Sequence, residues 1–591
     1  MRTGSKIVSI LLAAMLLITP MAGLTEAAGL FIPGSYTGTG EGMGGDVKVT
    51  VTFDAGTITD IAVGEHAETA GVSDPAIAKL PQAILDAQST QVDVVAGATM
   101  TSNAIIAAVN DAIVQAGADP AALVPVVQVG SSEATLAEAQ ADVVVVGGGL
   151  AGLSAAIKAS QSGASVILIE KMATLGGSSA LSGGGLGATN SSVQKENGIT
   201  DTNEDWRKLW EERQATSPEQ GSYPDWNKVD ALIAGSADSI DWYRSLGYEF
   251  RAPEGFGVDP VKRLHFPSPE GNGSVLTTFL GKKAEELGIT VMLETRGTEL
   301  IEENGVITGI MAEGANGHIT LKSKAVVLAC GGFGRSEELT ARFTPEVSDY
   351  IAYTVTGAGN TGDGIVMAEK VGATPYEDPW LIGLGLTSPV REMGSFYWYG
   401  MHIFLNMEGK RFTNEAGHYA IVYNDAVYKS PGGSLMVFDS GAAFESYVKV
   451  ADALVDNKLI YKADTIEALA AAVGISPENV KATIDAYNQN LAAGTDEFSK
   501  PAAVSMPITT APYYAVRYFP MSMGTFGGVK VGEHNDVLNG SGEPIPGLYA
   551  AGEMLNRPYY AQVYMSGSAL QLAATTGQTA GEAAAQFAKD K

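Results

Sequence analysis

The feature that most constrains the fold of this chain is a glycine motif between two short apolar runs. Gly147, Gly149 and Gly152 form a Gly-x-Gly-x-x-Gly pattern. An apolar run, 143–146, precedes the motif, and an alanine-rich stretch and a second apolar run, 166–169, follow it. This order predicts a strand, a tight turn, a helix and a second parallel strand. The motif therefore predicts a βαβ unit that binds the pyrophosphate of a dinucleotide.

Further residues around this unit are expected to contact the same nucleotide. Leu150 and Ala151 begin the predicted helix, whose free N–H groups favour a phosphate. Glu170 ends the second strand, where an acidic residue binds a ribose hydroxyl, and Lys171 follows it. A glycine–serine tract comes next and cannot form a packed element by itself, so we expect it to lie against the cofactor. Its expected contact residues are Gly176, Gly177, Ser178, Ser179, Ser182, Gly183 and Gly184.

Length, charge and cysteine content exclude several classes of protein. A chain of 591 residues predicts two to four domains. The formal net charge of −29 argues against a partner that is nucleic acid or an anionic membrane surface. Cys330 is the only cysteine, which excludes intramolecular disulfides, iron–sulfur clusters and thiolate zinc sites. The six histidines are scattered, so we predict no metal.

The N-terminal residues resemble a secretory signal peptide. Arg2 and Lys6 supply its positive region, and residues 7–18 supply its apolar core. A cut before Ala28 predicts a signal peptide at 1–27 and a protein that works outside the cytoplasmic membrane. A retained membrane anchor is the alternative.

Residues 33–118 predict a small α+β domain, with strands at 47–53 and 58–63 and helices near 75–88 and 103–117. The second helix follows Ala-Gly-Ala-Thr-x-Thr-Ser, which resembles the flavinylation motif of covalent FMN-binding domains. The resemblance implies a phosphoester between FMN and Thr101. Ala96 stands where that family usually has serine, and an ordinary capping threonine is the alternative. Residues 119–140 predict a linker.

Later motifs also resemble a known family. A buried strand ends in a glycine turn at 326–332, Thr361-Gly362-Asp363-Gly364 opens a helix, and a strand at 546–551 leads to Glu553. Together they resemble the flavoprotein superfamily of fumarate reductases, urocanate reductases and 3-ketosteroid dehydrogenases. The resemblance implies an α/β fold: a Rossmann-type FAD-binding domain at 141–370 and 510–591, with an inserted α+β cap at 371–509. We expect further cofactor contacts at Thr298, Gly331, Gly362, Asp363, Gly364, Glu553, Ser568, Ala569 and Leu570.

The predicted substrate site departs from the fumarate reductase pattern. Tyr419 stands where that family delivers its acid arginine, Gly524 replaces a histidine, and Tyr564 replaces a second arginine. Gly385 aligns with the remaining histidine. A site for dicarboxylates holds them through bidentate arginine, so these replacements argue against fumarate.

Two tyrosines at these places resemble 3-ketosteroid dehydrogenases. The resemblance implies that Tyr419 exchanges a proton with the substrate. It also implies that Tyr564, with a backbone N–H near Ser568, holds a ketone oxygen on which negative charge develops. Neighbouring aromatic residues suit a flat apolar substrate. The other expected substrate-binding residues are Tyr397, Trp398, Gly524, Arg557, Tyr560 and Ser568.

The sequence therefore predicts an extracytoplasmic two-flavin reductase. FMN on Thr101 would receive electrons from a membrane or extracytoplasmic donor, and FAD would pass hydride to a C=C bond conjugated to a ketone. A flavin transferase in the host would attach the FMN. One alternative is a monocarboxylate substrate such as a cinnamate or urocanate, with Arg557 on the carboxylate and His418 as the acid. Another is an electron carrier without substrate chemistry.

Overall fold

The computed structural model describes residues 30–69, 71–95, 97–123, 137–219, 221–256, 259–315, 317–455 and 458–591. The predicted signal peptide, Ala96 and most of the predicted linker lie outside these residues. The chain divides into two compact units. The first comprises residues up to 128 except 68–78 and 94–99, which group with the second unit.

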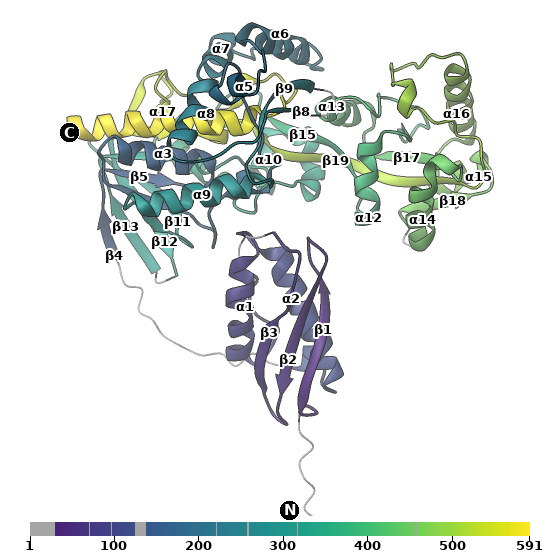
Figure 1. Cartoon of the computed structure of the whole chain (residues 1–591), viewed down its shortest axis with the longest axis horizontal. Helices are drawn as coiled ribbons and strands as arrows, with labels where there is room; N and C mark the ends of the chain where they lie inside the picture. The colour runs from purple at the N-terminus through teal and green to yellow at the C-terminus, as the bar shows by residue number, and fades with distance from the viewer. Residues whose placement is uncertain are drawn as a thin grey trace, which may run out of the picture. The chain divides into compact units, whose positions relative to one another are not determined.

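The first unit is built on an antiparallel sheet in the order β1-β2-β3. Its strands are β1 (Gly34–Glu41), β2 (Asp46–Phe53) and β3 (Ile58–Val63), and it contains most of the helices α1 (Asp74–Ala87) and α2 (Thr99–Gln115) (Figure 1). The helix α2 begins at Thr99 rather than at Asn103, so Thr101 lies in its first turn. A Cβ atom at Gly38 or Gly40 would come within 1.9 Å of a carbonyl oxygen of α2. Glycine in β1 therefore lets the sheet pack directly on this helix.

The second unit contains the predicted nucleotide-binding sheet, in the order β10-β6-β5-β14-β21-β20. The first five strands are parallel, and β20 is antiparallel to β21. Every residue of β5, β6 and β14 is buried, as expected for strands covered on both faces. These elements confirm the predicted α/β class and Rossmann-type topology. The strands are β10 (Thr290–Met292), β6 (Val166–Ile169), β5 (Val143–Val146), β14 (Ala325–Leu328), β21 (Pro544–Ala550) and β20 (Asp536–Leu538).

Two helices, α3 (Leu150–Gln161) and α17 (Ser568–Asp590), pack closely on one another beside this sheet (Figure 1). A Cβ atom at Gly577 would lie 2.3 Å from the Ala151 oxygen, and one at Gly581 would lie 2.2 Å from the Ala155 oxygen. The start of the C-terminal helix is thereby held beside the glycine motif.

Smaller elements surround the sheet. A second sheet has the order β11-β12-β13-β4, and a third has the order β7-β9-β8. Their strands are β11 (Arg296–Glu303), β12 (Val306–Gly314), β13 (Gly317–Lys322), β4 (Ala137–Gln140), β7 (Leu186–Gly187), β9 (Asp259–His265) and β8 (Glu254–Phe256). The helices of this part are α4 (Gly177–Leu181), α5 (Ser192–Glu196), α6 (Asn203–Gln214), α7 (Trp226–Ala234), α8 (Ser236–Ser245), α9 (Gly273–Glu286), α10 (Glu337–Phe343) and α11 (Asp363–Lys370).

The predicted cap contains a five-stranded sheet in which β15 pairs with β19, β19 with β17 and β18, and β17 with β16. Figure 1 shows β15 and β19 running side by side toward the outer helices. Because β19 belongs to this sheet, the cap sheet extends past residue 509, the predicted end of the cap. The strands are β15 (Trp380–Thr387), β16 (Ile403–Leu405), β17 (Ser434–Asp439), β18 (Ile460–Ala463) and β19 (Tyr513–Phe526). The helices are α12 (Arg391–Gly394), α13 (Tyr419–Lys429), α14 (Glu445–Leu454), α15 (Ile466–Val473) and α16 (Pro477–Ala492).

The described residues contain neither a helix that could span a membrane nor a cluster of metal ligands. None of their helices is long and apolar enough to cross a membrane. Likewise, within the described part of the chain no three His, Cys, Asp or Glu residues are grouped as metal ligands.

Candidate active site

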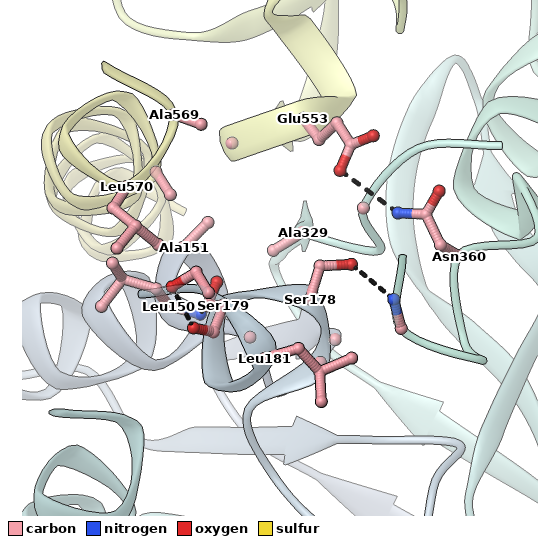
Figure 2. A pocket seen from close by; sticks show the side chains of 18 of the residues that line it. Leu150, Ala151, Ser178, Ser179, Leu181, Ala329, Asn360, Glu553, Ala569 and Leu570 are labelled. Carbon is pink, nitrogen blue, oxygen red and sulfur yellow. Dashed lines mark hydrogen bonds between the residues drawn. The ribbon is translucent and has the colours of Figure 1, made fainter. Parts of the chain in front are cut away.

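A cavity of about 400 Å³ lies between the carboxyl ends of the parallel strands and the cap. Residues from segments far apart in the sequence meet around it, as Figure 2 shows. The predicted cofactor residues that line it are Gly147, Gly149, Leu150, Ala151, Glu170, Lys171, Gly177, Ser178, Ser179, Ser182, Gly183, Gly184, Gly331, Asp363, Glu553, Ala569 and Leu570.

The glycine motif holds α3 against the end of β5. Gly147 has a φ of +110°, and a Cβ atom there would lie 2.3 Å from the Ala329 oxygen. A Cβ atom on Gly152 would lie 1.8 Å from the Gly147 oxygen. Both positions therefore require glycine, and the first turn of α3 is left facing the cavity.

Two groups of charges lie where β6 ends. The carboxylate of Glu170 accepts backbone hydrogen bonds from Gly148 at 2.7 Å and from Met172 at 2.8 Å. Burial raises the pKa of Glu170. Asp363 pairs with Lys171 at 2.8 Å and with Arg296 at 3.0 Å, so the two cations that line the cavity share one carboxylate.

Side-chain hydrogen bonds join the glycine–serine tract and the C-terminal loop to the rest of the cavity (Figure 2). Ser179 accepts from the Leu150 N–H at 3.3 Å, and Ser178 accepts from the Gly357 N–H at 3.0 Å. Glu553 accepts from the Asn360 amide at 3.2 Å. The serines thus connect the start of α3 with a loop that the sequence did not single out.

Several predicted cofactor residues do not line the cavity. Thr298 is one of them, and its hydroxyl donates to the Met311 oxygen at 3.1 Å, across the β11–β12 pair. Gly362 and Gly364 are two others. Gly362 turns the chain at φ +77°, and Gly364 packs against Met554 and Cys330. Gly176 donates its N–H to the Gly148 oxygen at 2.8 Å and so supports the loop from behind.

Three tyrosines line the cap side of the cavity. The hydroxyls of Tyr419 and Ser566 are 3.1 Å apart, and Tyr564 accepts from the Ala569 N–H at 3.3 Å. Tyr560 and Ser568 are hydrogen-bonded at 2.6 Å. The ring centroids of Tyr419 and Tyr564 are 6.3 Å apart. Burial raises the pKa of Tyr564, so its phenol is protonated at neutral pH.

Arg557 does not line the cavity, which argues against its predicted role on a substrate carboxylate. Its guanidinium donates to the backbone oxygens of Asp378, Tyr560 and Ala561, and lies 4.3 Å from the ring centre of Tyr223. These carbonyls occupy Nε and Nη1, three of the five N–H groups of the guanidinium.

His418 also lies outside the cavity lining, which argues against its predicted role as the acid. It is the N-cap of α13, and its Nδ1 accepts from the Ala420 N–H at 3.3 Å. Burial, with a contribution from Arg213, lowers the pKa of His418 to about 3. The imidazole is therefore neutral at pH 7 and stacks on the ring of Tyr419, with centroids 4.2 Å apart.

Four other predicted substrate residues, described below, do not line the cavity. The Tyr397 ring covers Gly385, and Trp398 is half exposed and contacts Tyr419 edge-on. Gly524 lies against Ile382 and Glu553, and its neighbour Met523 lines the cavity instead. The Ser568 N–H donates to the Met565 oxygen at 3.0 Å, so the N–H near Tyr564 is that of Ala569.

The charges of the lining decide what the cap side can bind. Among the described residues that line the cavity, Lys171 and Arg296 are the only cations, and both pair with Asp363. The lining from the cap and the C-terminal loop consists of aromatic, aliphatic and hydroxyl-bearing residues, among them Ile382, Leu384 and Met523, together with Glu553 and Asn556. A substrate carboxylate would find no arginine there.

The sequence missed several lining residues. They come from loops and from the start of β11, and the packing of distant segments brings them to the cavity. The main ones are Thr295, Arg296, Gly297, Gly357, Asn360, Asn556 and Ser566.

The cavity fits FAD. It joins a glycine turn, a helix N-terminus and a buried carboxylate at one end to aromatic residues at the other, the arrangement that an adenine dinucleotide with a flat ring system needs. The model of a family described as "FAD binding domain" matches residues 142–569, most of the chain. The chain belongs to this FAD-dependent oxidoreductase family. A second model, "FMN-binding domain", matches residues 42–114.

Several relatives of this flavoprotein act on C=C bonds as reductases. An NADH:acrylate oxidoreductase of Vibrio harveyi is 30% identical over 94% of this chain, which spans 62% of that relative. A urocanate reductase of Eggerthella lenta is 32% identical over 88% of this chain and 87% of the relative. A vinyl phenol reductase of Lactiplantibacillus plantarum is 30% identical over 76% of this chain and 96% of the relative.

Proposed function

We propose that this flavoprotein reduces a C=C bond conjugated to a carbonyl in an uncharged, largely apolar substrate, such as a ketosteroid-like enone. The observation that carries the proposal is the pairing of Tyr419 and Tyr564 in a lining whose only cations among the described residues, Lys171 and Arg296, pair with Asp363. A neutral phenol can stabilise an enolate oxygen and supply a proton, but it cannot replace the bidentate arginine that a carboxylate requires. The relatives include a reductase named for vinyl phenol, a substrate without a carboxylate.

Each tyrosine has its own role in the proposed reaction. FAD, when bound, supplies the hydride that is added to the β-carbon. Tyr564 donates a hydrogen bond to the substrate carbonyl, where negative charge develops. The Ala569 N–H, 3.3 Å from the Tyr564 oxygen, makes that phenol a stronger donor. Tyr419 gives its phenolic proton to the α-carbon.

Rates with a chemically reduced dye as electron donor test these roles. Tyr419→Phe and Tyr564→Phe should each lower kcat by about a hundredfold or more, the typical contribution of a positioned acid or an oxyanion donor. Tyr428→Phe is the matched control, because this tyrosine bonds to Gln562 and does not line the cavity. Full activity in both cavity variants would rule the mechanism out.

A monocarboxylate substrate is the second candidate, favoured by the relatives named for acrylate and urocanate. A matched pair separates the two proposals: an aryl enone and the aryl acrylate that carries the same C=C bond. Because the described residues on the cap side of the cavity include no arginine or lysine, we expect a higher kcat/KM for the enone. Rates confined to the acrylate would overturn the enone proposal.

We further propose that electrons reach FAD through FMN attached to Thr101, after a host flavin transferase has made the bond. The motif before α2 supports this assignment, because a helix N-terminus favours a phosphate. The signal-like segment 1–27 supports a location outside the cytoplasmic membrane, where a membrane or extracytoplasmic donor would supply the electrons. Cell fractionation with an antibody tests the location.

A further inference from the structure

Ser566 forms part of the wall between two cavities. One is the cavity that holds the three tyrosines, and the other is a separate space of about 10 Å³. The small cavity is lined by Leu209, Val261, Arg263, Leu264, Met565 and Ser566. Its volume is about enough for one water molecule.

The small cavity offers polar partners to such a water. Arg263 is 4% exposed and pairs with Asp201 through Nε and Nη2, at 3.0 and 2.7 Å. Its remaining nitrogen, Nη1, is buried and has no hydrogen-bond partner among the described residues. A buried guanidinium N–H without a partner is costly, and a water that it donates to would remove that cost. The Ser566 hydroxyl is the second polar group of this lining.

The same hydroxyl reaches the proposed acid. The oxygens of Ser566 and Tyr419 are 3.1 Å apart, which is hydrogen-bonding distance. On the other side of the small cavity, the Val261 side chain is 38% exposed, so this lining reaches the protein surface. Ser566 therefore connects the small cavity with Tyr419, and both residues also line the larger cavity.

We propose that Ser566 is a proton relay: it returns the phenolic proton to Tyr419 and takes a proton from a water held between Arg263 and Ser566. This inference rests on the proposed function. After Tyr419 has protonated the substrate carbon, its phenolate oxygen takes the hydroxyl proton of Ser566. Ser566 takes a proton from the water, and bulk solvent replaces that proton. The relay moves one proton per turnover and no electrons, and the guanidinium charge of Arg263 favours the transient anion.

Steady-state rates in H₂O and D₂O test the relay. Ser566→Ala should lower kcat about tenfold to a hundredfold with little change in KM, and should raise the solvent deuterium isotope effect on kcat. Ser566→Thr keeps the hydroxyl and should restore both values. Ser434→Ala is the matched control, because this buried serine bonds only within the cap, to Ser430 at 3.1 Å.

A second variant separates a relay from simple positioning of Tyr419. Leu209→Phe fills the small cavity but leaves the Ser566–Tyr419 contact intact, so it should also lower kcat and raise the isotope effect. If Ser566→Ala and Leu209→Phe keep the wild-type kcat and isotope effect while Tyr419→Phe is inactive, the relay is wrong and the proposed function stands. If Tyr419→Phe is fully active, the proposed function itself fails.

Discussion

The guanidinium of Arg557 donates a hydrogen bond to the Ala561 carbonyl at 2.9 Å. It also donates to the carbonyl of Asp378, which lies two residues before the first residue of the cap strand β15. Arg557 therefore joins the chain that enters the cap to the loop that carries Tyr560 and Tyr564. Its position makes it a structural residue of this junction.

Replacing Arg557 tests that role. Arg557→Met removes the donor of three backbone carbonyls, two of them in buried hydrogen bonds, so the free energy of unfolding should fall by about 3 kcal/mol. The ratio of kcat/KM for an aryl acrylate and its methyl ester should stay unchanged. Arg251→Met is a suitable control, because its ion pairs are partly exposed. If Arg557→Met lowered kcat/KM for the acrylate but not for its methyl ester, Arg557 would have a role in binding the substrate carboxylate.

Replacing Gly152 should affect how firmly the protein retains FAD. The Cβ atom of Gly152→Ala would lie 1.8 Å from the Gly147 oxygen, so α3 would have to move away from β5. We expect a loss of more than about 3 kcal/mol in unfolding free energy, together with loss of FAD absorbance from the purified protein. Gly540→Ala has no atom within 4 Å of its Cβ and should behave as wild type. Normal FAD content in Gly152→Ala would contradict this account of the turn.

The contrast between Gly152 and Arg557 explains what the sequence could predict. The glycine motif acts over a few residues, so its strand, turn and helix were predictable from spacing. The partners of Arg557 include Asp378, far away in the sequence, and only the folded chain shows that backbone carbonyls surround it. The position of Thr298 is a similar case, because its bond to Met311 depends on strand pairing. Tyr419 and Tyr564 come together in the cavity, but their link to Ser566 had no sequence signal.

Thr101 makes a prediction about covalent modification. It lies in the first turn of α2, two residues after Thr99, which shares the motif and serves as a matched control. In cells that contain a flavin transferase, intact-mass spectrometry should find one FMN on the wild type and on Thr99→Ser, and none on Thr101→Ala. FMN retained on Thr101→Ala would move the attachment site to another residue.

His265 predicts how stability depends on pH. Its Nδ1 lies 2.9 Å from the Arg263 oxygen, so that nitrogen carries the proton, and its Nε2 accepts from Ser191 at 2.7 Å. Burial lowers the pKa of His265 to about 4, below its ordinary value of 6.5. Between these values the unfolded chain binds a proton that the folded chain does not. This contribution to stability is therefore complete above pH 6.5 and is lost as the pH falls toward 4, by about 1.4 kcal/mol for each unit.

The measurement is the pH dependence of the unfolding free energy from pH 7 to pH 4. His265→Asn should lower stability at pH 7, because it disturbs the bonds to Ser191 and Arg263, but it should lose less stability on acidification than the wild type. His402 and His418, whose pKa values are also lowered by burial, keep part of the acid sensitivity in the variant. His318→Asn, at an exposed position, should leave the curve unchanged. An equal slope in His265→Asn and the wild type would show that folding does not lower the pKa of His265.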